Sequence, residues 1–149
     1  MTGDRGRQRS ARPLESVVVA ALAVRMSVPR TATASRDARH RLDEWMPPRC
    51  GPSATETALL LTSELVTNVV VHTDTVDVEV RAHCDGTRLR VCVDDAAVTP
   101  PRPFRSSSEP RSGSGRGLWL VEQMAARWGC QALPDGKRVW FEVPCAEKR

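Results

Sequence analysis

The chain of 149 residues is long enough for one domain with a modest core, and its 40% hydrophobic and 27% charged residues are ordinary for a soluble globular protein. Its formal net charge of +4 would favour a nucleic-acid partner if the charge were spread over the fold. Most of it lies instead in residues 1–13, where four arginines and one aspartate give +3. We therefore expect a disordered basic tail over 1–13, one domain over 14–145 and a short tail over 146–149.

The apolar segment 16–24 behind the basic tail has two interpretations. A strand over Val17–Val28, stopped by Pro29, fits its β-branched composition. The alternative is the apolar core of a signal peptide, with Ala21–Ala23 imitating a cleavage site. We favour the strand. The segment is shorter than the roughly 20 apolar residues that cross a membrane, and no other stretch approaches that length, so we expect no membrane partner.

The five cysteines indicate whether the protein works in an oxidising or a reducing cellular compartment. They form no CxxC pair, and an odd number leaves one over from any pairing scheme. This pattern fits reduced thiols in a cytoplasm better than a disulfide framework or a zinc site, so we expect a cytoplasmic protein.

Two helices follow in the chain. The segment Thr31–Met46 reads as a polar helix ended by two prolines. Ser53, with Glu56 three residues later, forms a capping-box pattern that predicts the start of a second, apolar helix. This second helix continues to His72.

Two alternating segments, Val76–Val80 and Leu89–Val93, predict antiparallel strands, and Asp85-Gly86 between them is a strong hairpin signal. Residues 96–112 then change composition, with four prolines and three arginines, which is typical of a lid or a disordered loop. We expect a lid.

The last part of the chain predicts a helix and two strands. The helix runs over Leu118–Trp128 with Gly129 as its C-terminal cap, and the strands run over Cys130–Leu133 and Lys137–Val143. The element order β-α-α-β-β-loop-α-β-β predicts an α+β two-layer sandwich, in which helices cover one face of a mixed, mostly antiparallel sheet.

Polar residues interrupt the apolar second helix at helical spacing. Glu64, Asn68 and His72 are four residues apart, so they share one face. Burying such groups without partners costs about 2–7 kcal/mol each, so the face should line a wet cleft or hold a ligand. An amide oxygen beside a carboxylate suits magnesium, which usually shares its oxygen ligands with phosphates. The alternative is a half-exposed pair that hydrogen-bonds to a neighbouring loop.

Two further features suit a nucleotide. Gly113-x-Gly-x-Gly117 opens a helix, where bare backbone N–H groups and the positive end of the dipole favour an anion, although a flexible linker would look similar. Asp95 ends a strand just before the predicted lid and could accept a hydrogen bond from the amine of adenine. A turn or helix-cap aspartate is the alternative.

In combination these motifs resemble those of the Bergerat-fold ATPases, the superfamily that includes histidine kinases, gyrase B-type subunits and Hsp90. More narrowly, the chain resembles the anti-sigma-factor serine/threonine kinases over about residues 17–144. The most specific similarities are Ser63–Asn68 with His72, Gly115–Leu118, Trp128-Gly129, and Gly136-Lys137 with Val139-Trp140.

The resemblance implies a role for each matching residue. Asn68 would coordinate magnesium bridged to the phosphates of ATP, and Glu64 would act as general base on a substrate serine or orient its hydroxyl. Asp95 matches the adenine-reading aspartate. His72 either fills a common family position or, as we favour, caps its helix. The glycine-rich phosphate box would consist of Gly113, Gly115, Arg116, Gly117 and Leu118, with Arg116 either touching phosphate or solvated.

The implied activity is an ATP- and magnesium-dependent protein kinase that phosphorylates an anti-sigma-factor antagonist and regulates a sigma factor. Relatives of this kind often form homodimers. The alternative is an ATP-binding regulatory module with weak or no catalysis, because Ala97 and its neighbours replace hinge glycines after Asp95, and because Arg138 stands where many relatives have a threonine near the adenine. A nucleic-acid binder is a weaker alternative, since aromatic residues are few and no DNA- or RNA-reading motif is present.

Overall fold

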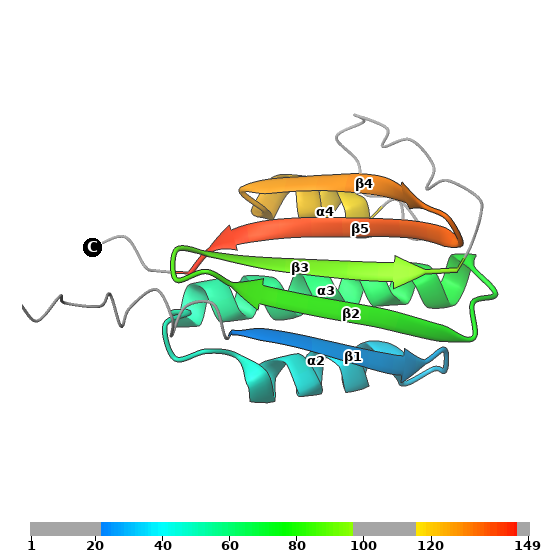
Figure 1. Cartoon of the computed structure of the whole chain (residues 1–149), viewed down its shortest axis with the longest axis horizontal. Coiled ribbons are helices and arrows are strands. Elements are labelled where there is room, and N and C mark those ends of the chain that lie inside the picture. Colours follow the sequence, from blue (N-terminus) through cyan, green and yellow to red (C-terminus); the bar gives the residue numbers. More distant parts are fainter. Residues whose placement is uncertain (1–21, 97–115, 146–149) are drawn as a thin grey trace, which may run out of the picture.

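The computed structural model describes residues 22–96 and 116–145, and the order of elements in this part matches the predicted order (Figure 1). The elements are β1 (Ala23–Pro29), α2 (Ala34–Trp45), α3 (Pro52–His72), β2 (Asp77–Cys84), β3 (Arg88–Asp95), α4 (Arg116–Met124), β4 (Arg127–Leu133) and β5 (Gly136–Pro144). The predicted tails over 1–13 and 146–149, and all of the predicted lid except residue 96, lie outside the described residues.

The five strands form one sheet in the order β1-β2-β3-β5-β4, and α2, α3 and α4 lie together on one face of it (Figure 1). This confirms the α+β two-layer architecture. Every strand pair in the described part is antiparallel, so the expectation of a mixed sheet was wrong. Short turns reverse the chain between β2 and β3 and between β4 and β5, whereas β1–β2 and β3–β5 are antiparallel across longer connections that contain helices.

The core lies between the sheet and the helices. Leu89, Val91 and Val93 alternate toward the helices from β3, and Phe141 faces the same way from β5 with no exposed surface. From the helix layer, Leu61 of α3 is equally buried. Each such side chain contributes about 1.5–3 kcal/mol by leaving water. This burial determines which side of each strand faces the helices.

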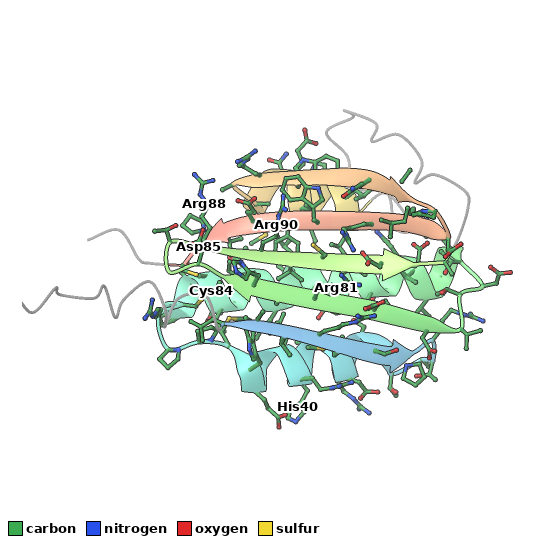
Figure 2. All side chains as sticks on the ribbon, viewed as in Figure 1. His40, Arg81, Cys84, Asp85, Arg88 and Arg90 are labelled. Carbon is green, nitrogen blue, oxygen red and sulfur yellow. The ribbon has the colours of Figure 1, made fainter. Side chains whose placement is uncertain are left out.

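The other face of the sheet is polar. Figure 2 shows Arg81 and Arg90 on this face, away from the helices, and the Arg90 guanidinium lies 4.0 Å from the centroid of the Trp140 ring. In the part of the chain that the structure describes, no helix combines the length and hydrophobicity of a membrane-spanning helix.

The hairpin between β2 and β3 forms where Asp85-Gly86 predicted it. The Asp85 carboxylate accepts backbone hydrogen bonds from Arg88 at 2.8 Å and from Thr87 at 2.9 Å. Gly86 has φ 95°, which glycine adopts without a steric penalty. The bond from Arg88, followed by those from Thr87, lowers the pKa of Asp85 below its ordinary value.

Two predicted helix ends were wrong. Helix α3 begins at Pro52 with Gly51 as its N-cap, so Ser53 lies inside the helix and makes no capping bond. Proline suits the first helical position because the N–H that it lacks would be unpaired there. At the other site, α4 ends at Met124, and Gly129 lies in β4 rather than capping a helix. There a Cβ would stand 2.8 Å from Nε1 of Trp140, so the absence of a side chain lets the indole ring pack on the strand.

Candidate functional site

The predicted polar row, Glu64, Asn68 and His72, lies on one uninterrupted helix, α3. Glu64 and Asn68 are half-buried, one turn apart on the same face. His72 is exposed in the last turn, where a basic side chain interacts favourably with the helix dipole. The capping role that we favoured for His72 stays a prediction, because the capping hydrogen bonds at this helix end come from Thr73.

Hydrogen bonds stabilise the turn of α3 that carries Glu64. The carbonyl of Ser63 accepts a bond from the Ser35 hydroxyl of α2 at 2.9 Å and one from the Thr67 hydroxyl at 2.8 Å. The bond from Ser35 ties α2 to α3 immediately before Glu64, and the bond from Thr67 lies within α3. The carboxylate is thus held on a rigid part of the scaffold.

Helix α4 begins against this row. Gly117 is buried, and a Cβ added to it would stand 2.5 Å from Nδ2 and 3.3 Å from Oδ1 of Asn68. The first turn of α4 therefore approaches the Asn68 amide as closely as a residue without a side chain permits. The sequence predicted both residues as parts of one site, and the structure brings them together.

The structure describes only part of the rest of the glycine-rich box. Gly113 and Gly115 lie outside the described residues, and Arg116 is the first residue of α4. The Leu118 side chain is 8% exposed and belongs to the core, so only its backbone is left for the predicted phosphate contact.

Asp95 lies at the end of β3, on the face of the sheet that the helices cover. Its side chain is 2% exposed and forms an ion pair with Lys137, with 3.1 Å between Oδ2 and Nζ. Gly136 packs so closely on the Asp95 carbonyl that a Cβ would overlap it. The next residue, Ala96, donates its N–H to the Thr75 hydroxyl at 3.2 Å. These contacts fix the place of the carboxylate.

The structure corrects the prediction about Arg138. Its guanidinium binds both carboxylate oxygens of Asp94, at 2.7 and 2.8 Å, on the outer face of the sheet. Because neighbouring residues of a strand point to opposite faces, it is Lys137 that lies beside Asp95. Sequence reasoning missed Lys137. The alternation of β5 indicates that Lys137 shares a face with buried Val139, but its place beside Asp95 follows from the pairing of β5 with β3.

The sequence matches a family model for the histidine kinase-like ATPase domain over residues 28–143. The fold is similar to that of the RsbU and RsbW domains of Rv1364c from Mycobacterium tuberculosis, with 19% identity and a TM-score of 0.60, over 80% of this chain and 31% of that one. It is also similar to the histidine kinase domain of the Erythrobacter litoralis EL346 blue-light activated histidine kinase, with 24% identity and a TM-score of 0.50, over 78% of this chain and 61% of that one.

The chain thus spans less than two thirds of either solved chain. A search of curated proteins gave no significant match. The family model nevertheless covers well over half of the sequence, including α3, β3 and α4. The protein therefore belongs to the histidine kinase-like ATPase domain family.

Proposed function

We propose that the protein is an ATP- and magnesium-dependent serine/threonine kinase of the anti-sigma type. The observation that carries the proposal is the contact between Asn68 and Gly117, which joins an amide on the side of α3 to the amino-terminal turn of α4. Membership of an ATPase family and the fold similarity to a protein with an RsbW domain support it.

The residues at this contact fit a metal-bound triphosphate. Magnesium takes oxygen ligands and shares them with phosphates, and the Asn68 amide offers such an oxygen. The first turn of a helix offers unpaired N–H groups and a positive dipole end to the phosphates. A Cβ at residue 117 would stand 2.5 Å from the Asn68 amide nitrogen, so glycine is what lets the start of α4 come this close to the amide.

The remaining residues would position and activate the substrate. A bound ATP with magnesium would supply the phosphoryl group and neutralise its charge. Glu64, one turn before Asn68, would accept the proton of a substrate serine or orient its hydroxyl. Asp95, fixed by Gly136, would accept a hydrogen bond from the adenine amine. Little else is needed, because phosphoryl transfer depends mainly on positioning and charge neutralisation.

We propose that the phosphorylated substrate is an anti-sigma-factor antagonist and that a sigma factor is the second partner, in the cytoplasm. A homodimer of the chain is part of this proposal. The test is incubation of the protein with γ-labelled ATP, magnesium and a candidate antagonist. Transfer of label to a serine of the antagonist is expected, and its absence under saturating nucleotide would refute the kinase assignment.

One observation favours a second candidate function, that of a nucleotide-binding regulatory module with little or no catalysis. The Asp95 carboxylate already has the Lys137 ammonium at 3.1 Å, so an adenine amine would have to share or displace that ion pair. Such competition would weaken nucleotide binding. The labelling experiment separates the two functions, because a pure binder would take up ATP saturably and transfer no label.

A further inference from the structure

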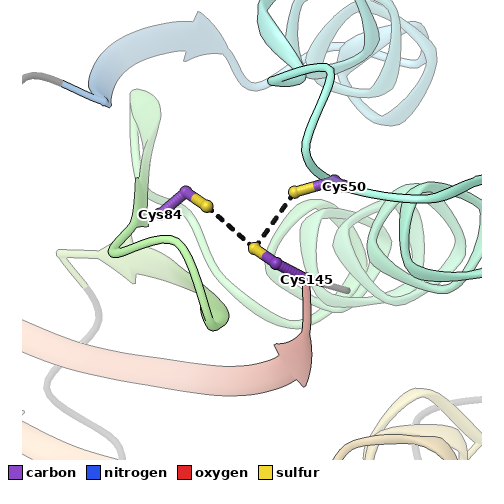
Figure 3. A group of neighbouring side chains, drawn as sticks. All are labelled: Cys50, Cys84 and Cys145. Atoms are coloured by element: carbon purple, nitrogen blue, oxygen red, sulfur yellow. Dashed lines mark hydrogen bonds between the residues drawn. The ribbon is translucent and has the colours of Figure 1, made fainter. Parts of the chain in front are cut away.

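Three of the five cysteines meet inside the core, as Figure 3 shows. Cys50 lies between α2 and α3, Cys84 is the last residue of β2, and Cys145 follows β5 directly. The Cys145 sulfur is 2.8 Å from that of Cys84 and 3.1 Å from that of Cys50, and the three sulfurs lie within 4.8 Å of one another. Cys84 and Cys145 have no exposed surface, and Cys50 is 7% exposed. We call these three residues the thiol cluster.

Backbone hydrogen bonds hold the three segments in place. The Gly51 N–H donates to the Cys145 carbonyl at 3.0 Å, and the Cys145 N–H donates to the Thr87 carbonyl at 2.8 Å. The convergence of the sulfurs thus follows from how the ends of β2 and β5 pack against the loop before α3. The cluster is a preorganised feature of the fold.

The thiol cluster is separate from the candidate nucleotide site. Cys84 pairs with Leu89 at the start of β3, whereas Asp95 is at the end of the same strand. Six residues of strand correspond to roughly 20 Å. The two sites therefore lie at opposite ends of the sheet, and the cluster needs an explanation that the nucleotide does not supply.

We propose that the thiol cluster binds one thiophilic metal ion, of the class of Cu(I) or Zn(II), through three thiolates. Thiolate is the ligand that these soft and borderline ions prefer in proteins. A metal ion about 2.3 Å from each sulfur would hold the sulfurs roughly 4 Å apart. That spacing exceeds the two shortest observed separations and lies within the 4.8 Å limit, so small side-chain rotations suffice.

A metal ion accounts for the cluster better than a disulfide does. Both Cys50 and Cys84 approach the same sulfur of Cys145. A disulfide would use one of them and leave the other as a buried thiol beside it, whereas a three-coordinate ion uses all three. Burial raises the pKa of the Cys145 and Cys50 thiols, so they are protonated at neutral pH without metal, and metal binding releases protons.

The test uses the full-length, reduced, metal-free protein without nucleotide, titrated anaerobically with Zn(II) or Cu(I) against a chromophoric chelator. We expect one equivalent of one of these ions to bind, and its X-ray absorption spectrum to show three sulfur ligands at about 2.3 Å. Cys145→Ser and Cys50→Ser should lower the affinity roughly a hundredfold or more. Cys92→Ser and Cys130→Ser are the matched controls, because both residues lie outside the thiol cluster. Cys92 is half-buried and Cys130 is exposed. Each of these two variants should bind the ion as tightly as the wild type does.

Several outcomes would overturn the proposal. It fails if the wild type binds neither ion, if the bound ion has nitrogen or oxygen ligands instead of three sulfurs, or if folded Cys145→Ser binds as tightly as the wild type. Far-ultraviolet circular dichroism shows whether each variant is folded. The absorption spectrum of the wild type decides the question even if both cluster variants unfold.

Discussion

Gly117 and Asn68 meet where the first turn of α4 approaches the side of α3, and a Cβ at residue 117 would stand 2.5 Å from the amide nitrogen of Asn68. Two segments about fifty residues apart thus place a bare helix end and a side-chain amide at one point. We propose that the phosphates and the metal ion bind at this contact.

The first prediction concerns Gly117→Ala. The added methyl group would push the Asn68 amide aside, so affinity for magnesium-ATP should fall roughly tenfold or more in titration calorimetry, which corresponds to about 1.4 kcal/mol. Overpacking should also lower the free energy of unfolding by about 1–3 kcal/mol in urea denaturation.

Gly129→Ala is the matched control for this variant. Its methyl group would press on the Trp140 ring, on the outer face of the sheet, instead of on Asn68. It should lower stability by a similar amount and leave nucleotide affinity unchanged. If Gly117→Ala bound nucleotide as tightly as Gly129→Ala does, the contact at residue 117 would have no part in binding.

The second prediction concerns Glu64. Glu64→Ala should bind magnesium-ATP as the wild type does and lose phosphoryl transfer by roughly 10²–10⁴-fold, because a positioned general base contributes about that much. Calorimetry measures the first quantity and transfer of γ-label to the antagonist the second. Full transfer activity in this variant would remove Glu64 from the catalytic role.

The third prediction compares Lys137 with Arg138, which are adjacent in β5 and point to opposite faces. Lys137→Ala removes a cationic partner of buried Asp95, so the free energy of unfolding should fall by about 1–3 kcal/mol, and the affinity for ATP should change. Arg138→Ala breaks the pair with Asp94 on the outer face and should leave ATP affinity unchanged. If Arg138→Ala altered ATP affinity as much as Lys137→Ala, the assignment of the two faces to different roles would be wrong.

The fourth prediction is a pH dependence in the hairpin. The folded-state pKa of Asp85 lies below the ordinary value of 3.8, so the carboxylate contributes stability above pH 3.8 that is lost as the pH falls through the folded-state pKa. Asp85→Ala should therefore be less stable than the wild type at pH 7 and nearly as stable well below pH 3.8. Urea denaturation at both pH values measures this difference, and a constant difference between the two proteins would contradict it.

Sequence patterns correctly predicted those features that depend on residues close together in the chain. The spacing of Glu64 and Asn68 identified one helix face, and the alternation of β3 placed Asp95 at the end of a strand. Composition also located the hairpin at Asp85-Gly86. Each of these features depends on a few residues whose preferences agree with the fold.

The patterns failed where a contact depends on register between distant segments. Lys137 lies beside Asp95 only because of how β5 pairs with β3, and Gly129 looked like a helix cap although it serves close packing against Trp140. The thiol cluster joins residues 61 and 95 positions apart, which no spacing rule reveals. Tertiary packing decides such contacts, and local propensity does not report it.

The proposed function requires that a metal-bound triphosphate is held between Asn68 and the start of α4. The most direct test is calorimetric titration of wild type and Asn68→Ala with ATP, each with magnesium and with EDTA. We predict saturable, magnesium-dependent binding to the wild type and its loss in Asn68→Ala, whereas Val71→Ala, a change at an exposed residue of the same helix, should bind as the wild type does. Equal magnesium-dependent affinity in wild type and Asn68→Ala would mean that Asn68 does not bind the metal ion.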